Sequence, residues 1–242
     1  FDDRFICYSK WIVERPIYDT MRHMLHEGNL GLNVVRQVKT GESWQHCLIS
    51  NKITESCYLS NKTGEIGYLC PLYLYPEEKE SKSNSGITMT LFEPEVPYGK
   101  KGRAPNIAPE IFEMLKKAYM KQPSPEDILY YIYAILYSNK YREKYAEFLK
   151  IDFPRIPFTS NFKLFKKTAG LGEKSVQLHL LDSPDLDPPI AKYKGTADND
   201  TIEKPVYQEK EQRIYINNDQ YFEGVTKEVW EYCIGGYRVL EK

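Results

Sequence analysis

The feature that most constrains the fold is a change in the hydrophobic pattern near residue 106. Before it, short apolar segments are separated by turn-forming residues, which is typical of strands. After it, up to residue 181, apolar residues recur with the spacing of helices. Because strands and helices are segregated along the chain rather than alternating, the sequence predicts an α+β fold.

The first part contains three strand candidates and several turn candidates. The strand candidates are residues 5–8, 30–35 and 47–49. The turn candidates have the residue types that turns require, and they are Gly28-Asn29, Thr40-Gly41 and residues 61–64. We expect a short helix over residues 21–26, and the polar, low-complexity residues 77–86 predict a loop.

The helical part has a clear start signal at Ser124. This serine is followed by proline and two acidic residues, the pattern of a helix N-terminus. One apolar face then follows with helical spacing, formed by Ile128, Tyr131, Ile132, Ile135 and Leu136. A second helix is expected over residues 141–149. A third is expected after Ser160, and Gly170 and Gly172 are the positions where it could be interrupted.

The C-terminal part predicts a short mixed tail. A Pro/Asp-rich connection over residues 182–189 leads to a hairpin over residues 206–216 and a short helix over residues 227–233, which Gly235-Gly236 would end. We therefore expect one domain, made of a strand-rich lobe (1–105), a helical lobe (106–181) and a tail that completes the fold (182–242).

Composition excludes several classes of protein. The five cysteines are an odd number without a Cys-x-x-Cys pair, which favours buried thiols in a reducing cytosol over disulfides or a zinc site. No apolar run approaches the roughly 18–20 residues of a membrane span, and no signal peptide opens the chain, so we expect a cytoplasmic protein without membrane contact. Phe1 in place of methionine indicates a piece of a longer polypeptide.

Motifs for catalysis, cofactors and metals are missing from the sequence. His23 and His26 have the spacing of two metal ligands, but no third ligand accompanies them. The run Asp187-Pro188-Pro189-Ile190 resembles the adenine-holding loop of amino-methyltransferases, yet it has isoleucine where that loop needs an aromatic residue. No glycine-rich cofactor turn precedes it. We expect no catalytic, cofactor or metal site, and no binding of S-adenosylmethionine.

Charge is distributed unevenly along the chain. Residues 98–167 contain 14 Lys/Arg against 7 Asp/Glu, although the net charge of the whole chain is −1. Residues 182–211 are acidic instead, with 8 acids against 4 lysines. A locally basic surface on a neutral protein is compatible with contacts to nucleic-acid phosphates. Helices with ordinary solvated faces are the alternative explanation.

Several stretches together carry a family resemblance. The most specific are the run from Tyr141 to Phe158 and the end Ile234-Gly235-Gly236-Tyr237, and Pro71–Pro76 and Asn29–Leu32 followed by Arg36-Gln37 add to them. With these motifs in order, the chain resembles the C-terminal specificity region of Type ISP restriction–modification enzymes and related adenine-specific DNA methyltransferases. The resemblance covers essentially the whole chain.

This resemblance implies a function. In that family, one polypeptide joins a target-recognition domain to an adenine-N6 methyltransferase domain, in some members with a nuclease and a helicase motor. The chain would then be the target-recognition domain, non-catalytic in isolation, with double-stranded DNA as its partner. S-adenosylmethionine would bind in the covalently linked methyltransferase domain. The alternative is a domain that docks onto the methyltransferase and makes little DNA contact of its own.

A domain that recognises a DNA sequence needs cationic side chains that contact phosphates. It also needs amide or cationic side chains on projecting segments, which form hydrogen bonds with base edges. Two segments meet this requirement. The first surrounds the Thr40-Gly41 turn and provides Arg36, Gln37, Lys39, Gln45 and His46. The second is the loop from Tyr98, which provides Lys100, Lys101 and Arg103. For each of these residues an ordinary surface or scaffold role is the alternative, and Trp44 is expected in the core.

Overall fold

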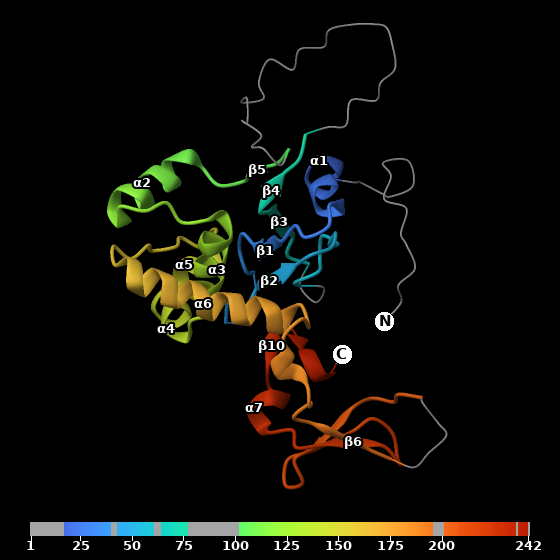
Figure 1. Cartoon of the computed structure of the whole chain (residues 1–242). Coiled ribbons are helices and arrows are strands. Elements are labelled where there is room, and N and C mark those ends of the chain that lie inside the picture. Colours follow the sequence, from blue (N-terminus) through green and yellow to red (C-terminus); the bar gives the residue numbers. More distant parts are fainter. Residues whose placement is uncertain are drawn as a thin grey trace, which may run out of the picture.

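We describe the fold from a computed structural model, which covers residues 17–39, 43–60, 64–76, 102–195, 201–235 and 237–241 (Figure 1). The predicted strand at residues 5–8, the turn at Thr40-Gly41 and the loop over residues 77–86 lie outside these ranges. A three-stranded sheet lies at the centre, helices cover one side of it, and a second sheet forms a separate C-terminal layer. The α+β class predicted from the sequence is confirmed.

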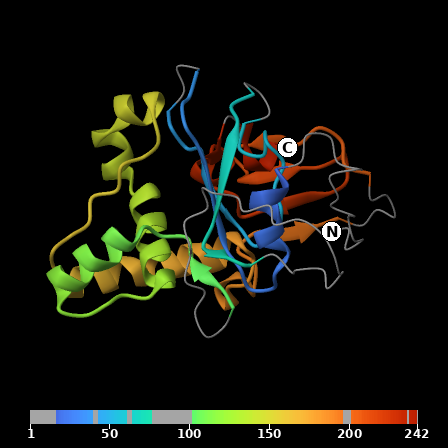
Figure 2. The same ribbon diagram turned by 90° about the horizontal axis from the view of Figure 1, so that it is seen from above.

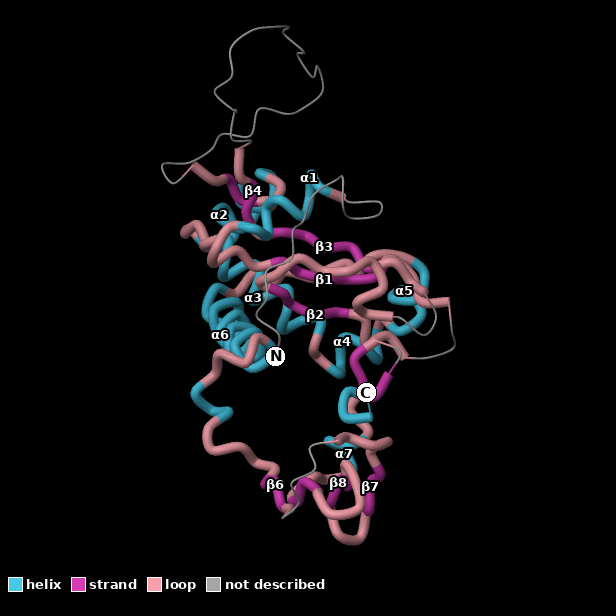
Figure 3. Tube along the Cα trace, turned by 90° about the vertical axis from the view of Figure 1, so that its right-hand side faces the viewer, coloured by secondary structure: helices cyan, strands magenta, loops and turns pink. Residues whose placement is uncertain are grey.

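The central sheet is antiparallel. It consists of β1 (Gly31–Val35), β2 (Cys47–Ser50) and β3 (Gly67–Pro71) in the order β2-β1-β3, and the three strands lie side by side in Figure 3. Leu32 of β1 is opposite Ile49 of β2 and Cys70 of β3. The predicted strands at 30–35 and 47–49 are therefore correct.

The short helix predicted over residues 21–26 is present as two turns, α1 (Tyr18–Met21) and the 3₁₀ turn η1 (Arg22–Leu25). A buried amide attaches it to β4 (Tyr73–Leu74), which pairs with β5 (Ala104–Pro105). The Nδ2 of Asn29 donates to the carbonyls of His23 and Tyr73 at 2.9 and 3.0 Å, and its Oδ1 accepts from the Tyr73 amide at 3.1 Å. Because every polar atom of this amide is paired, its hydrogen bonds offset the desolvation penalty of its burial.

The helical layer consists of α2 (Pro109–Tyr119), α3 (Pro125–Leu136) and α6 (Phe162–His179). Ser124 caps α3 as predicted, because its Oγ accepts a hydrogen bond of 3.1 Å from the Asp127 amide. The prediction of one apolar face on α3 was incomplete, since Leu129 and Tyr133, which lie outside that face, are also buried. The physical reason is that α3 packs on two sides, against the sheet and against α2 and α6.

Two predicted helices differ in the structure. The helix expected over residues 141–149 is two short helices, α4 (Asn139–Lys144) and α5 (Ala146–Ile151), because the backbone leaves helical geometry at Tyr145. In contrast, α6 continues through both Gly170 and Gly172. A β-carbon on Gly172 would lie 1.8 Å from the Tyr130 carbonyl oxygen of α3, so this glycine allows α3 and α6 to pack closely.

The C-terminal part forms a second antiparallel sheet of four strands in the order β6-β9-β8-β7, visible below the central sheet in Figure 3. Its strands are β6 (Lys192–Lys194), β7 (Val206–Gln208), β8 (Arg213–Tyr215) and β9 (Tyr221–Glu223). The predicted hairpin over residues 206–216 is its β7–β8 pair, whereas β6 and β9 were not predicted. The short turn η2 (Pro184–Leu186) lies in the predicted connection before β6.

The end of the chain returns to the central sheet. The helix expected over residues 227–233 is shorter, α7 (Lys227–Trp230), and Cys233 belongs to β10 (Cys233–Ile234). This strand pairs with β11 (Tyr237–Arg238), which leads into the turn η3 (Val239–Glu241). Between the two strands, the amide of Gly235 donates to the carbonyl of Gln45 at 3.1 Å.

The cysteines are less buried than predicted. Among the four described free cysteines only Cys47 is buried, and its burial raises the pKa of its thiol. In the described ranges, no helix is long and apolar enough to cross a membrane.

Candidate nucleic-acid interface

The first predicted DNA-contacting segment is the connection between β1 and β2, residues 36–46. Its described parts, 36–39 and 43–46, extend from the sheet at the same edge as α4 and α5, opposite α6 (Figure 2). A backbone hydrogen bond of 3.1 Å from the Val38 amide to the Lys150 carbonyl joins the connection to α5. The segment is therefore a projection held by secondary structure on both sides, as precise recognition requires.

Arg36 is exposed and forms a weak ion pair. Its Nε donates to Oδ1 of Asp152 at 3.0 Å, and both side chains are at least half exposed. The Phe153 amide and the Arg36 guanidinium hold the pKa of the Asp152 carboxyl below its usual range, and Arg155 adds to the effect. Exposed pairs of this kind contribute little to stability, so the guanidinium can exchange this carboxylate for a phosphate or a base edge at small cost.

Gln37 and Lys39 have exposed side chains, as a base-reading role requires. The backbone of Lys39 is fixed, because its amide donates to Oε1 of Glu65 at 3.1 Å. Between the two, Val38 is buried in the core. Because the buried Val38 anchors the backbone between them, Gln37 and Lys39 point outward from a rigid segment.

The other side of the connection, residues 43–46, differs from the prediction. His46 is buried, so its ring is not placed to contact DNA in this structure. Gln45 is partly buried, and its Nε2 lies 3.4 Å from Oγ of Ser43. Trp44 is in the core, as expected. Residues 44–46 lead directly into β2, so their side chains alternate between the two faces as they do in a strand. Trp44 and His46 are buried on the face that the helices and the returning C-terminal segment cover.

The second predicted segment is only partly described, because Lys100 and Lys101 lie outside the described residues. Arg103 is described, and it is engaged within the protein. Its guanidinium lies 3.7 Å above the ring of Tyr73 and 3.9 Å from Oε1 of Glu126. The Tyr73 hydroxyl donates to the same carboxylate oxygen at 2.5 Å. Because a cation stacked on a ring and paired with an acid stabilises the fold, Arg103 is better explained as a link between β4, β5 and α3.

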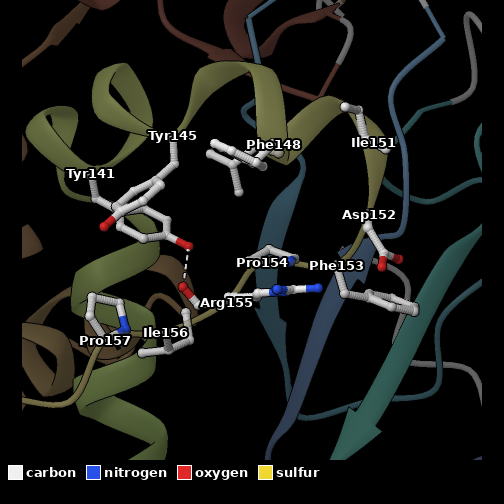
Figure 4. A pocket seen from close by; sticks show the side chains of 11 residues that line it. Tyr141, Tyr145, Phe148, Ile151, Asp152, Phe153, Pro154, Arg155, Ile156 and Pro157 are labelled. Atoms are coloured by element: carbon white, nitrogen blue, oxygen red, sulfur yellow. Dashed lines mark hydrogen bonds between the residues drawn. The ribbon is translucent and has the colours of Figure 1, made fainter.

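An apolar groove lies beside the first segment (Figure 4). It has a volume of about 660 Å³ and is lined by residues 141–157 of α4, α5 and the chain that follows them. Tyr141 closes one side, since its hydroxyl donates to the Arg155 carbonyl at 2.8 Å. Phe148 on the rim is 72% exposed. The groove coincides with the most specific stretch of the family resemblance.

Arg155 lies beside Arg36, which the sequence did not predict. Arg155 is exposed, lines the groove, and acts on the same carboxylate as Arg36. Its only sequence signal was membership in the basic excess of residues 98–167. The pairing of residues from β1 and from the end of α5 depends on how the helices pack on the sheet. Together, the exposed residues Arg36, Gln37, Lys39 and Arg155 form a polar, cationic surface around the connection, which we call the tip surface.

No metal site is found among the described residues, in which no three His, Cys, Asp or Glu side chains are grouped as ligands. The two histidines with metal-ligand spacing have other contacts. Nδ1 of His23 accepts a hydrogen bond of 3.0 Å from the Tyr75 amide, and the ring of His26 stacks on the Tyr75 ring at 3.7 Å. Burial and the neighbouring Arg22 lower the pKa of His23 to about 4. Both rings therefore hold η1 against the chain after β4.

Comparison with solved structures finds the same fold in larger enzymes. The ATP-dependent Type ISP restriction–modification enzyme LlaBIII bound to DNA aligns with a TM-score of 0.63 and 21% identity, over 88% of this chain and 12% of that chain. A nuclease-deletion mutant of the Type ISP enzyme LlaGI with a DNA substrate mimic gives a TM-score of 0.59 and 22% identity, over 93% and 17%. The cryo-EM structure of a DrdV–DNA complex gives 0.62 and 23%, over 88% and 19%.

The chain thus spans less than a fifth of the length of these proteins, and the identities are low enough that the likeness establishes the fold alone. Comparison with curated proteins gives no match. A family model covers almost the whole chain, residues 1–241, and its description agrees with the resemblance seen in the sequence. The chain belongs to the family of Type ISP C-terminal specificity domains.

Proposed function

We propose that this chain recognises a target sequence in double-stranded DNA for an adenine-N6 DNA methyltransferase of a restriction–modification enzyme. Family membership supports this role, and the related structures are described as DNA complexes. The observation that carries the proposal is the tip surface. Exposed Arg36, Gln37 and Lys39 project from a backbone fixed by the sheet and by α5.

The two kinds of contact that DNA recognition needs are divided within the tip surface. Gln37 and Lys39 can pair with base edges in a major groove about 12 Å wide. Arg36 and Arg155 lie to one side and suit phosphates, which position the protein without carrying sequence information. The chain is not itself a catalyst in this proposal. Chemistry and S-adenosylmethionine binding belong to a methyltransferase domain linked to it.

Methylation by the full enzyme tests the base-reading role. Lys39→Ala and Gln37→Ala should each broaden the methylated sequence at one position, because one good base contact contributes about 1–3 kcal/mol of discrimination. Genome-wide mapping of methylated adenines measures this. Lys117→Ala, an exposed lysine of α2 far along the chain from the tip surface, is the control and should leave the sequence unchanged. Parental specificity in both tip variants would show that this surface does not read the target.

Phosphate contact is tested separately on the chain itself. Arg155→Ala should weaken binding to all duplexes alike and reduce the slope of log affinity against log salt by about one. If affinity for duplex DNA does not depend on salt between low and moderate concentrations, the tip surface makes no phosphate contacts. Titration of the chain with S-adenosylmethionine completes the test, and micromolar binding would contradict the non-catalytic assignment.

A further inference from the structure

Helix α6 has two apolar faces, and the described residues cover only one of them. The inner face, with Phe165, Ala169, Gly172 and Val176, is buried against the rest of the protein. A second row of leucines lies elsewhere on the helix surface. Leu164, Leu171 and Leu178 are 51%, 58% and 39% exposed. A surface helix needs one apolar stripe for its own core, so this second row is not explained by the fold of the chain.

The spacing of the row is that of a helix-packing seam. The three leucines are separated by seven residues each, which places them on one side of the helix along about 21 Å. A seven-residue repeat of leucine is the pattern with which one helix packs along another. Between the leucines lie the small side chains of Thr168 and Ser175, which let a neighbouring helix approach. We call this row, residues 164, 168, 171, 175 and 178, the leucine stripe.

Unpaired cations follow one flank of the leucine stripe. Lys163, Lys167 and Lys174 are exposed, and none of them has a carboxylate within 4 Å among the described residues. Lys166, one position away, instead pairs with Asp127 of α3 at 2.7 Å. Within the described part of the chain, the lysine beside α3 therefore has a carboxylate partner, and the three lysines beside the stripe have none.

Gly170 lies on the same flank, between Lys167 and Lys174. A β-carbon at Gly170 would meet nothing within 4 Å, so no contact with the residues that the structure describes requires a glycine there. Glycine in a helix interior costs about 1 kcal/mol relative to alanine. Gly172 differs from Gly170 in this respect, because it faces α3 and has no room for a side chain, whereas the surface around Gly170 is open to an approach from outside the chain.

We propose that the leucine stripe of α6 binds an acidic amphipathic helix of another protein domain, with its apolar residues between the leucines and its carboxylates along Lys163, Lys167 and Lys174. The positive charge of the lysine flank favours an acidic partner. In a pair of antiparallel copies of α6 the lysine flanks would face each other and repel, which argues against a second copy of this chain. The stripe's apolar surface distinguishes it from the tip surface, and α6 lies away from the β1–β2 connection, towards the other end of the strands (Figure 2). The inference does not rest on DNA recognition.

A designed peptide tests this surface with the chain as it is. The probe is a three-heptad peptide with leucine at the two seam positions and glutamate at the flanking positions. The matched control has lysine in place of each glutamate. Self-repulsion keeps both peptides from pairing with themselves. Fluorescence anisotropy at low salt should show binding of the acidic peptide and at least tenfold weaker binding of the basic one.

Two variants locate the binding. Leu171→Glu should weaken acidic-peptide binding at least tenfold, and the double variant Lys167→Glu/Lys174→Glu should reverse the preference toward the basic peptide. Lys116→Glu/Lys117→Glu on α2 adds the same charge change elsewhere and should leave the preference intact. All replaced side chains are exposed, and thermal unfolding checks that each variant keeps its fold.

Three results would overturn the proposal. The first is that the chain binds both peptides equally well, or binds neither of them. The second is a dimer of the chain in sedimentation that Leu171→Glu converts to a monomer, which would make a second copy the occupant. The third is a larger loss of duplex-DNA affinity in Lys167→Glu/Lys174→Glu than in the α2 double variant, which would make the stripe's flank a nucleic-acid surface.

Discussion

Gly235 and Gln45 join the C-terminal segment to the segment that leads into β2, since the amide of Gly235 donates to the carbonyl of Gln45 at 3.1 Å. The φ angle of Gly235 is +59°, and a β-carbon there would lie 1.6 Å from the Leu59 carbonyl oxygen. Glycine is therefore required twice at this position, for its conformation and for the space. This explains physically why Gly235, the first glycine of the family-like motif, is held against the segment that leads into β2.

Replacing Gly235 by alanine should strongly destabilise the protein. The backbone conformation alone costs alanine about 1–2 kcal/mol, and the overlap with the Leu59 carbonyl adds to it because main chain cannot rotate away. Gly64→Ala is the matched control, since its φ is +69° but a β-carbon there meets nothing within 4 Å. Urea unfolding should show a clearly larger loss for Gly235→Ala than for Gly64→Ala. Equal losses would mean that the C-terminal segment is not packed on Leu59.

The two glycines of α6 should respond in opposite directions to alanine. Gly170→Ala should stabilise the isolated chain by about 0.5–1 kcal/mol, as in an exposed helix interior. Gly172→Ala should destabilise it by several times that amount, because the β-carbon would meet the Tyr130 carbonyl at 1.8 Å. Thermal unfolding of the two variants measures this. Destabilisation by Gly170→Ala would instead place that glycine in an internal contact.

The hydrophobic periodicity and the helix-capping residues correctly predicted the elements whose structure depends on neighbouring residues in the sequence. The Ser124 cap, the strands at β1 and β2 and the β7–β8 hairpin are of this kind. The errors arose where packing between distant segments decides the outcome. The helix at Tyr141 breaks at Tyr145 where the groove forms, and α6 tolerates Gly172 because α3 needs the space.

In the candidate site, too, the sequence predicted local features but not those that depend on packing between distant segments. Exposure of Arg36, Gln37 and Lys39 agrees with their assignment from sequence, although their contact with DNA stays a prediction. For His46 and Arg103, residue type suggested a role that burial and stacking exclude or weaken. A polar residue type does not reveal whether its side chain faces the core. That depends on which segment returns to cover it, here the chain around Gly235 and the ring of Tyr73.

His23 should make stability depend on pH. Its pKa is lowered to about 4 in the folded protein against about 6.5 unfolded, because burial and Arg22 disfavour the charged ring. The unfolded chain therefore binds the proton first as pH falls. The contribution of neutral His23 is complete above pH 6.5 and is lost as pH falls from about 6.5 to about 4, by at most about 3 kcal/mol.

Urea titrations at pH 7 and pH 5 measure this dependence in the parent and in His23→Gln. The variant should be less stable at pH 7 but should lose less stability between the two pH values. His179, whose pKa burial also lowers, contributes in both proteins and cancels in the comparison. His26→Gln is the control from the same turn. An unchanged pH dependence in His23→Gln would show that the ring of His23 does not remain neutral in the fold.

Asp152→Asn should strengthen the binding of duplex DNA. The carboxylate of Asp152 holds the Arg36 guanidinium at 3.0 Å and places a negative charge within the cationic tip surface. Asparagine keeps the shape and an oxygen that accepts from the Phe153 amide, but removes the charge, so Arg36 becomes available for a phosphate. Affinity for all duplexes should rise, and the slope of log affinity against log salt should steepen by about one. Glu211→Gln, which similarly releases Arg213 in the C-terminal sheet from its 3.0 Å pair, is the matched control and should change neither quantity. If Asp152→Asn binds DNA no better than this control, Arg36 does not face the duplex, and the interface lies elsewhere on the domain.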